Sequence, residues 1–244
     1  MKRTALVIAT MIGISVLALR GRAQQAGPEG GTEKTKQGRG RGGFAPAEAG
    51  SDLSKPPIPK DDGEKKILAA LDQARQGQRY ANVSTADGRL LRQLTEALNA
   101  KRVVELGTST GESGLWFAMA LRKTGGHLYT HDIDAGRISV ARENFKKAGV
   151  EDIITIVEGD GHQTASKNTD PIDVLFIDAE KEGYDAYLRE LLPYVRRGGL
   201  ILAHNMRRPA PNPRYVEAIT SNPDLDTSFV LMDGAGIGIT LKKR

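Results

Sequence analysis

The sequence predicts an α/β fold built on a doubly wound, seven-stranded sheet with helices on both faces. The sheet is expected to be mostly parallel, with one antiparallel strand near the C terminus. Two observations support this prediction. Apolar, β-branched runs alternate with segments of helical periodicity between residues 102 and 221, which is typical of parallel strands joined by helices. The last two apolar runs flank Asp233-Gly234, a pair typical of a hairpin turn.

Each element follows from a local pattern. Two helices are expected before the first strand, one at 64–76 and one that begins at an N-cap, Ser84 or Thr85, and places its leucines on one stripe. Apolar runs predict strands at 102–106, 127–131, 153–157, 172–177, 199–203, 226–232 and 236–242. Helical periodicity predicts helices at 112–123, 135–148, 162–167, 182–194 and 213–221. Gly149 is expected to end the second of these helices.

The charge of the chain is unevenly distributed. Residues 1–60 hold 10 Lys and Arg against 4 Asp and Glu, whereas the remaining residues hold 25 against 26. The net charge of +5 therefore belongs to the N-terminal part, and a basic nucleic-acid-binding face on the rest is not expected. The chain has no cysteine, which excludes disulfides, thiolate chemistry and metal sites built on cysteine.

Composition divides the chain into three parts. Residues 1–23 combine a basic start, an apolar run and small residues, the pattern of a secretory signal peptide or membrane anchor, so we expect export or membrane anchoring. Residues 24–60 are rich in Gly, Pro and Gln, which predicts a disordered linker. Residues 61–244 contain the alternating strands and helices of the folded domain.

A strand, a glycine turn and a helix follow one another between residues 102 and 123. The turn has the spacing E-x-G-x-x-x-G, formed by Glu105, Gly107 and Gly111, which differs from the dinucleotide fingerprint and from the P-loop. Such a turn lets backbone N–H groups approach a nucleotide-like ligand. The next apolar run ends at Asp132, whose carboxylate can accept hydrogen bonds from both hydroxyls of a ribose.

Polar residues stand at the ends of five consecutive predicted strands. They are Glu105, Asp132, Asp160, Asp178 and the pair His204-Asn205. In a doubly wound sheet, ligands bind at the carboxyl ends of the strands. We therefore expect a ligand cleft at this edge of the sheet.

From about residue 64 to the C terminus, the chain resembles the class I, S-adenosylmethionine-dependent O-methyltransferases of the cation-dependent catechol and caffeoyl-CoA type. The matching segments are 79–84, 103–113, Asp132, 159–162, 176–181 and 199–205. The first glycine motif is shared by many S-adenosylmethionine (SAM) enzymes, whereas 176–181 and 199–205 are more specific. The resemblance implies a Rossmann-like fold and methyl transfer from SAM to a hydroxyl of a small, phenolic or catechol-like molecule.

The resemblance also implies roles for individual residues. Those expected to bind SAM are Asn82, Val83, Glu105, Gly107, Ser109, Gly111, Ser113, Asp132, Ile133, Gly159, Asp160, Gly161, His162 and Asp178. A divalent cation is expected at Asp178, His204 and Asn205, where it lowers the pKa of the substrate hydroxyl. Lys181 is expected to take the hydroxyl proton.

One position departs from the family pattern. Where the family has Asp before Asn205, this chain has His204, so Asp178, His204 and Asn205 have a formal charge of −1 instead of −2. We expect weaker Mg²⁺ binding, with Mn²⁺, Fe²⁺, Co²⁺ or Zn²⁺ as candidate ions. Two alternatives stay open from the sequence: His204 is a general base in a metal-free site, or it is a structural histidine.

Three functions fit the sequence. The first is the O-methyltransferase described above. The second is a SAM-binding protein with weak or no metal-dependent catalysis, and the third is a metal-independent methyltransferase that uses His204 as base. We expect a small hydroxylated molecule as substrate, no nucleic-acid partner, and membrane contact only through the N-terminal segment. A homodimer is left open.

Overall fold

The structure is a computed structural model that describes residues 55–76, 80, 82–209, 211–231 and 234–244, within one unit, Asp52–Arg244. The predicted signal peptide or anchor at 1–23 lies outside the described residues, and so does the predicted linker apart from residues 55–60. In the described ranges, no helix is both long enough and apolar enough to cross a membrane.

Strands and helices alternate along the chain as the sequence predicts. The strands are β1 (Arg102–Leu106), β2 (His127–Asp132), β3 (Ile154–Glu158), β4 (Ile172–Ile177), β5 (Val195–Ala203), β6 (Leu225–Val230) and β7 (Ile237–Lys242). The α-helices are α1 (Asp62–Gln76), α2 (Thr85–Ala97), α3 (Glu112–Thr124), α4 (Ala135–Ala148), α5 (Gly161–Thr164), α6 (Tyr184–Leu191) and α7 (Pro213–Ser221). Short 3₁₀ helices are η1 (Glu151–Ile153), η2 (Ala165–Lys167) and η3 (Lys181–Gly183).

Capping residues explain several of these boundaries. Ser84 is the N-cap of α2, where its side chain accepts a hydrogen bond from the Asp87 N–H. Asp134 and Asn212 cap α4 and α7 in the same way. Gly149 ends α4 in the left-handed conformation, as predicted.

The boundary between α6 and β5 differs from the sequence prediction. The helix expected at 182–194 is divided into η3 and α6 and ends at Leu191, and β5 begins at Val195 instead of residue 199. Val195 pairs with Ile172 of β4, and the register then shifts before Val174 pairs with Leu200. The additional strand residues are held by this irregular pairing with β4, which local periodicity does not reveal.

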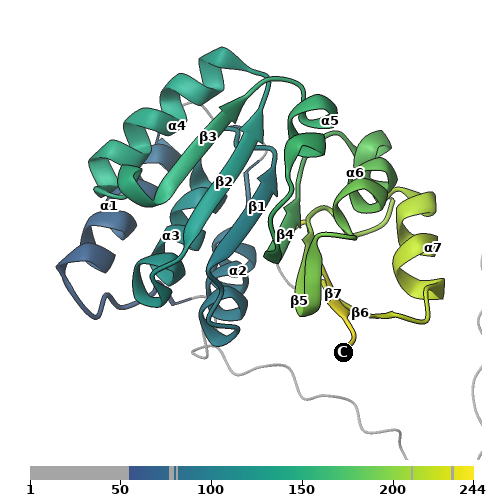
Figure 1. Ribbon diagram of the computed structural model, residues 1–244. Helices are drawn as coiled ribbons and strands as arrows, with labels where there is room; N and C mark the ends of the chain where they lie inside the picture. The colour runs from purple at the N-terminus through teal and green to yellow at the C-terminus, as the bar shows by residue number, and fades with distance from the viewer. Residues whose placement is uncertain (1–54, 77–79, 81, 210, 232–233) are drawn as a thin grey trace, which may run out of the picture. The chain divides into compact units, whose positions relative to one another are not determined.

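The seven strands form one sheet in the order β3-β2-β1-β4-β5-β7-β6 (Figure 1). The strands from β1 to β5 pair in parallel, whereas β7 pairs antiparallel with both β5 and β6. Within this sheet, β7 is thus the strand that runs against the others. The predicted fold class is confirmed.

Helices cover both faces of the sheet. Figure 1 shows α1 to α4 on one side and α5 to α7 on the other. Apolar side chains form one core cluster on each face: Trp116 and Phe117 of α3 are buried in the first, and Tyr184 of α6 and Tyr215 of α7 are buried in the second.

The winding direction reverses between β1 and β4, which are neighbours in the sheet although β2 and β3 separate them in sequence. Crevices that bind ligands form at such a switch point. Gly107 follows β1 with a φ of 103°, and a Cβ added there would lie 2.3 Å from the backbone oxygen of Asp178. Only glycine fits where the ends of β1 and β4 pass this closely.

Candidate functional site

A cavity of about 430 Å³ lies at the carboxyl ends of the strands, at the predicted edge. Its wall is formed by Leu106, Gly107, Ser109, His131, Asp132, Ile133, Arg137, Asp160, Gly161, His162, Asp178, Ala179, Glu180, Lys181, Tyr187 and Asn205. Ten residues of the predicted site belong to this wall: Gly107, Ser109, Asp132, Ile133, Asp160, Gly161, His162, Asp178, Lys181 and Asn205. The size is in the range of pockets that bind small molecules.

The other predicted site residues do not line this cavity. They are Asn82, Val83, Glu105, Gly111, Ser113, Gly159 and His204. The side-chain amide of Asn82 donates to Thr110 Oγ1 at 2.8 Å and to Glu112 Oε1 at 2.7 Å, so Asn82 joins the segment before α2 to the start of α3. Contacts of the first six with SAM stay predictions; His204 was predicted as a metal ligand or catalytic residue.

Asp132, at the end of β2, is held by two backbone N–H groups. Ser109 N–H donates to Oδ2 at 2.7 Å, and Asp134 N–H donates to Oδ1 at 2.9 Å. Each carboxylate oxygen keeps a lone pair for a further donor. The fixed carboxylate on the cavity wall fits the predicted contact with sugar hydroxyls.

At another part of the wall, an imidazole stacks on a phenol ring. The rings of His162 and Tyr187 lie 4.2 Å apart at an angle of 5°, and His162 Nε2 lies 2.8 Å from Oε1 of Glu180. Asp160 caps α5, since its Oδ1 accepts from the His162 N–H at 3.0 Å. Sequence reasoning did not select Tyr187 as a site residue, because it lies within a helix and only the fold brings it to the cavity.

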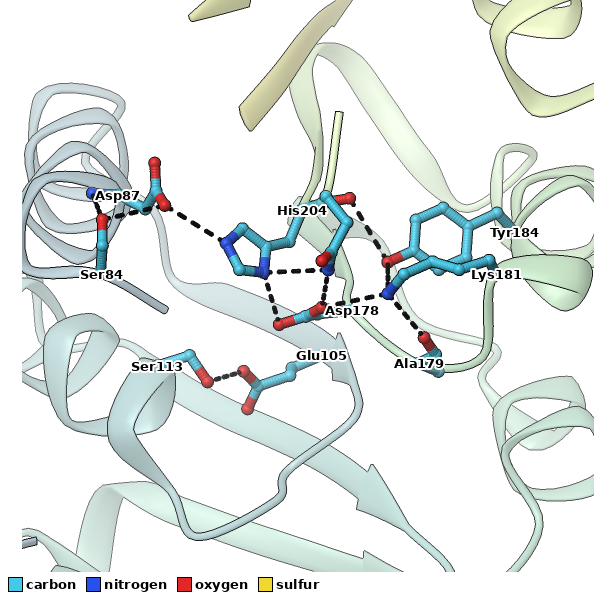
Figure 2. Close-up of polar contacts among 10 residues, drawn as sticks. Ser84, Asp87, Glu105, Ser113, Asp178, Ala179, Lys181, Tyr184 and His204 are labelled. Carbon is cyan, nitrogen blue, oxygen red and sulfur yellow. Dashed lines mark hydrogen bonds and ion pairs between the residues drawn. The ribbon is translucent and has the colours of Figure 1, made fainter. Parts of the chain in front are cut away.

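Glu105, in β1, is fully buried behind the glycine turn. Its carboxyl group accepts hydrogen bonds from the hydroxyl of Ser113, as Figure 2 shows, and from the hydroxyl of Thr130. Burial raises the pKa of Glu105 to about 8, although these two hydrogen bonds act in the opposite direction. The arrangement makes Glu105 a support for the turn and for the first residues of α3. It is not part of the cavity wall.

The ends of β4 and β5 place three predicted residues beside one another. His204 Nδ1 lies 3.0 Å from Asp178 Oδ2, and the side-chain amide of Asn205 donates to Asp178 Oδ1 at 2.9 Å. A residue from α2 completes the group: Asp87 Oδ2 lies 3.3 Å from His204 Nε2. Figure 2 shows His204 between the two carboxylates. The sequence did not indicate Asp87, which lies in the first turn of a helix, where acidic residues are common.

The two carboxylates determine the charge of His204. Burial of the imidazole opposes its protonation, but the hydrogen bonds that the ring donates to Asp178 and Asp87 and the negative charges of both outweigh this effect and raise the pKa of His204 to about 9. The pKa of Asp87 is lowered: burial opposes this shift, but the hydrogen bonds that the carboxylate accepts from His204 and Ser84 prevail. The group is therefore a buried ion bridge with a central imidazolium.

The donor set around Asp178 does not fit the predicted cation. Its two oxygens face the ring nitrogen of His204, the amide nitrogen of Asn205 and, at 3.9 Å, the ammonium nitrogen of Lys181. Both ring nitrogens of His204 face carboxylates, and Asn205 Nδ2 also lies 3.1 Å from Nδ1, so the protonated ring has no lone pair for a metal or for a substrate proton. In the part of the chain that the structure describes, no group of three or more His, Asp or Glu side chains has the geometry of a metal site.

Lys181 lies in η3 and reaches the cavity wall. Its ammonium donates to the backbone oxygen of Ala179 at 3.3 Å and to the hydroxyl of Tyr184 at 3.4 Å. Burial raises the pKa of Tyr184, so its hydroxyl stays protonated. Lys181 is thus the amine beside Asp178 and Asn205 at the cavity, and its role as base stays a prediction.

Comparisons with known proteins agree with this geometry. A family model described as O-methyltransferase matches residues 60–207. The catechol O-methyltransferase of Niastella koreensis is 35% identical over 147 residues, which cover 58% of this chain and 66% of that protein. The catechol O-methyltransferase of Mycobacterium tuberculosis is 34% identical over 149 residues, or 61% of this chain and 67% of that protein.

A solved structure agrees over a larger part of the chain. The structure of the O-methyltransferase from Bacillus cereus in complex with SAH (S-adenosylhomocysteine) matches this chain with a TM-score of 0.63 and 25% sequence identity. The match covers 76% of this chain and 93% of that one. The chain spans about two thirds of the length of the two curated relatives (66% and 67%). Since the family model matches more than half of its residues, this chain belongs to the O-methyltransferase family.

Proposed function

We propose that this protein transfers a methyl group from SAM to a hydroxyl of a small, phenolic molecule. One observation supports this most directly. The same cavity is lined by Asp132, which suits sugar hydroxyls, and by Asp178, Lys181 and Asn205, which suit a reacting hydroxyl. Two relatives of the chain are catechol O-methyltransferases, which supports a catechol-type substrate.

The residues of the cavity fit SAM. When bound, SAM supplies a methyl group on a positively charged sulfur. Asp132 accepts hydrogen bonds from the ribose hydroxyls of SAM. The wall near Asp160 and His162 provides polar contacts for the adenine ring. At Gly161, a Cβ would lie 2.9 Å from the hydroxyl of Tyr187, so glycine keeps this part of the wall open.

The chain contributes mainly positioning, because an in-line transfer needs the accepting oxygen, the methyl carbon and the sulfur on one line. The negative charges of Asp132 and Asp178 suit a positively charged donor. Lys181 first loses a proton to water, and its neutral amine then accepts the proton of the substrate hydroxyl, while the amide of Asn205 orients the oxygen. The oxygen then forms the new bond to carbon as the carbon–sulfur bond breaks and its electron pair stays on sulfur.

Radiolabelled SAM and a panel of phenols and catechols test this function. We expect labelled methyl ethers, whose yield depends on Lys181, and calorimetric binding of SAM to the protein alone. Binding of SAM without turnover across the panel contradicts the proposal and favours a SAM-binding protein. Absence of SAM binding contradicts it at an earlier step.

The predicted divalent cation is not part of this mechanism, since the donor set does not fit it. Export or membrane anchoring through residues 1–23 and assembly into a homodimer are further proposals that rest on the sequence alone. Because SAM is made in the cytosol, export would separate the protein from its donor. Cell fractionation tests export or membrane anchoring. Light scattering coupled to size-exclusion chromatography tests the homodimer.

A further inference from the structure

We propose that the Asp87–His204–Asp178 bridge takes the place of the divalent cation in this protein, and that Asp87 is the positioning residue that holds it. The effect of Asp87 on turnover rests on the proposed methyl transfer. The claim that the side chain of His204 closes the site to a metal ion rests on geometry alone.

Each ring nitrogen of His204 lies close to a carboxylate oxygen. A neutral imidazole donates from one ring nitrogen, whereas His204 faces a carboxylate oxygen with each nitrogen, at 3.0 Å and 3.3 Å. A ring with two N–H groups donates to both carboxylates, and Asn205, whose amide lies 3.1 Å from Nδ1, donates to the other oxygen of Asp178. The positive charge that a cation would bring to Asp178 is therefore present on a side chain of the protein.

The side chains of His204 and Asp87 are buried. His204 is 3% exposed and Asp87 is 6% exposed, so water cannot replace either partner. An unpaired charge at such a position is costly, whereas a charge between two hydrogen-bonded carboxylates is compensated. The protonated ring of His204 lies between the two carboxylates, so it offsets part of their negative charge without a metal ion.

Asp87 is itself held in place by hydrogen bonds. Ser84 Oγ donates to Asp87 Oδ2 at 2.9 Å, and the backbone N–H of Ala235 also donates to the carboxylate. A Cβ on Gly234 would lie 1.8 Å from Asp87 Oδ2, so the segment before β7 covers this carboxylate only because residue 234 is glycine. Asp87 thus connects α2 and the segment before β7 to the end of β5.

The bridge has two consequences for the reaction. It orients the Asp178 carboxylate, whose other oxygen accepts from Asn205, and so fixes two groups of the cavity wall. It also replaces oxygen donors for a metal by N–H donors. Replacing His204 by aspartate removes the bridge and leaves oxygen donors at Asp178, at position 204 and on Asn205, which is a donor set for a hard cation.

Binding of Mn²⁺ to the full-length chain tests this inference, read from the loss of the free Mn²⁺ signal in electron paramagnetic resonance. The samples are the wild type, His204→Asp, His204→Gln and Asp87→Asn. Asp72→Asn is the matched control, because Asp72 is an exposed acid on α1. Calorimetric binding of SAM and circular dichroism on the same samples report separately on the proposed function and on folding.

We expect the wild type, His204→Gln and the control to leave the Mn²⁺ signal unchanged, and His204→Asp to take up one equivalent. Turnover of the wild type survives exhaustive chelation.

Asp87→Asn lowers kcat about tenfold or more with little change in the KM for SAM, because it displaces groups near the reacting oxygen and not those that bind the donor. Asp72→Asn changes neither constant.

Uptake of one equivalent of Mn²⁺ by the wild type overturns the proposal, and so does a folded His204→Asp that takes up none. Loss of wild-type turnover on chelation overturns it as well. An unchanged kcat in Asp87→Asn removes Asp87 from its positioning role. If no substrate is methylated but SAM binds, the Mn²⁺ measurements still decide the structural part, so the two failures are distinguishable.

Discussion

His204 Nε2, at the end of β5, lies 3.3 Å from Oδ2 of Asp87, in the first turn of α2, although 117 positions separate the two residues in the sequence. This contact joins the helical layer that precedes the sheet to the strand ends that form the cavity. It also gives His204 a second carboxylate partner beside Asp178. A site that resembles a metal centre in its sequence is thereby an ion bridge in the folded protein.

The ribose contact is tested by Asp132→Ala. We expect SAM binding to weaken by about 1–3 kcal/mol, since removal of the carboxylate leaves ribose hydroxyls without their acceptor. Isothermal titration calorimetry measures the change. Asp134→Ala is the comparison, because Asp134 follows closely in sequence, caps α4 and does not line the cavity. Equal affinities of wild type and Asp132→Ala rule out the ribose assignment.

The base role is tested by Lys181→Met, which keeps much of the side-chain length but removes the amine. We expect kcat to fall about 10²- to 10⁴-fold, the usual contribution of a positioned base, while SAM affinity is retained. Steady-state kinetics with the best substrate of the panel, together with calorimetry, give both quantities. Full activity of Lys181→Met assigns proton removal to another group or to water.

Substitution of Gly107 tests the close approach of β1 and β4. Gly107→Ala is expected to destabilise the fold by about 2 kcal/mol or more, because φ is 103° and the new Cβ would lie 2.3 Å from a backbone oxygen. Gly149→Ala is the control: its φ is 66°, but no atom lies within 4 Å of the added Cβ, so about 1 kcal/mol is expected. Urea denaturation measures both, and equal losses contradict the steric argument.

Burial of Glu105 makes stability depend on pH. Its folded pKa of about 8 lies above the ordinary value of 4.5, so its contribution to stability is complete below pH 4.5 and is lost as the pH rises through 8. Glu105→Gln keeps the shape of the neutral acid and removes this loss. The stability difference between variant and wild type should shift in favour of the variant over this interval, by at most about 1.4 kcal/mol per pH unit.

Denaturant unfolding of both proteins at a series of pH values measures this difference. Ser139→Ala, at an exposed position of α4, serves as a control that should follow the wild type at every pH. A constant difference between Glu105→Gln and wild type from pH 5 to pH 9 would show that Glu105 titrates at its ordinary pKa.

Local patterns predicted most of the elements because strands and helices have different apolar periods, and because caps such as Ser84 and Gly149 act within a few residues of the helix end. The start of β5 was predicted too late, since Val195 pairs with Ile172 of β4 before the register shifts. Ten of the predicted site residues line one cavity because parallel strands end at the same edge of a sheet.

The sequence by itself determined the order of the strands along the chain, the glycine turn after β1 and the acidic residues at the strand ends, since each depends on neighbours within one element. The tertiary structure alone decided that Glu105 is buried behind the turn, that Tyr187 stacks on His162 and that Asp87 faces His204. These features are contacts between distant segments, and charge and pKa depend on what surrounds a side chain in space. A histidine that the sequence allowed to be a ligand, a base or a structural residue becomes the centre of an ion bridge only when α2 packs beside the end of β5.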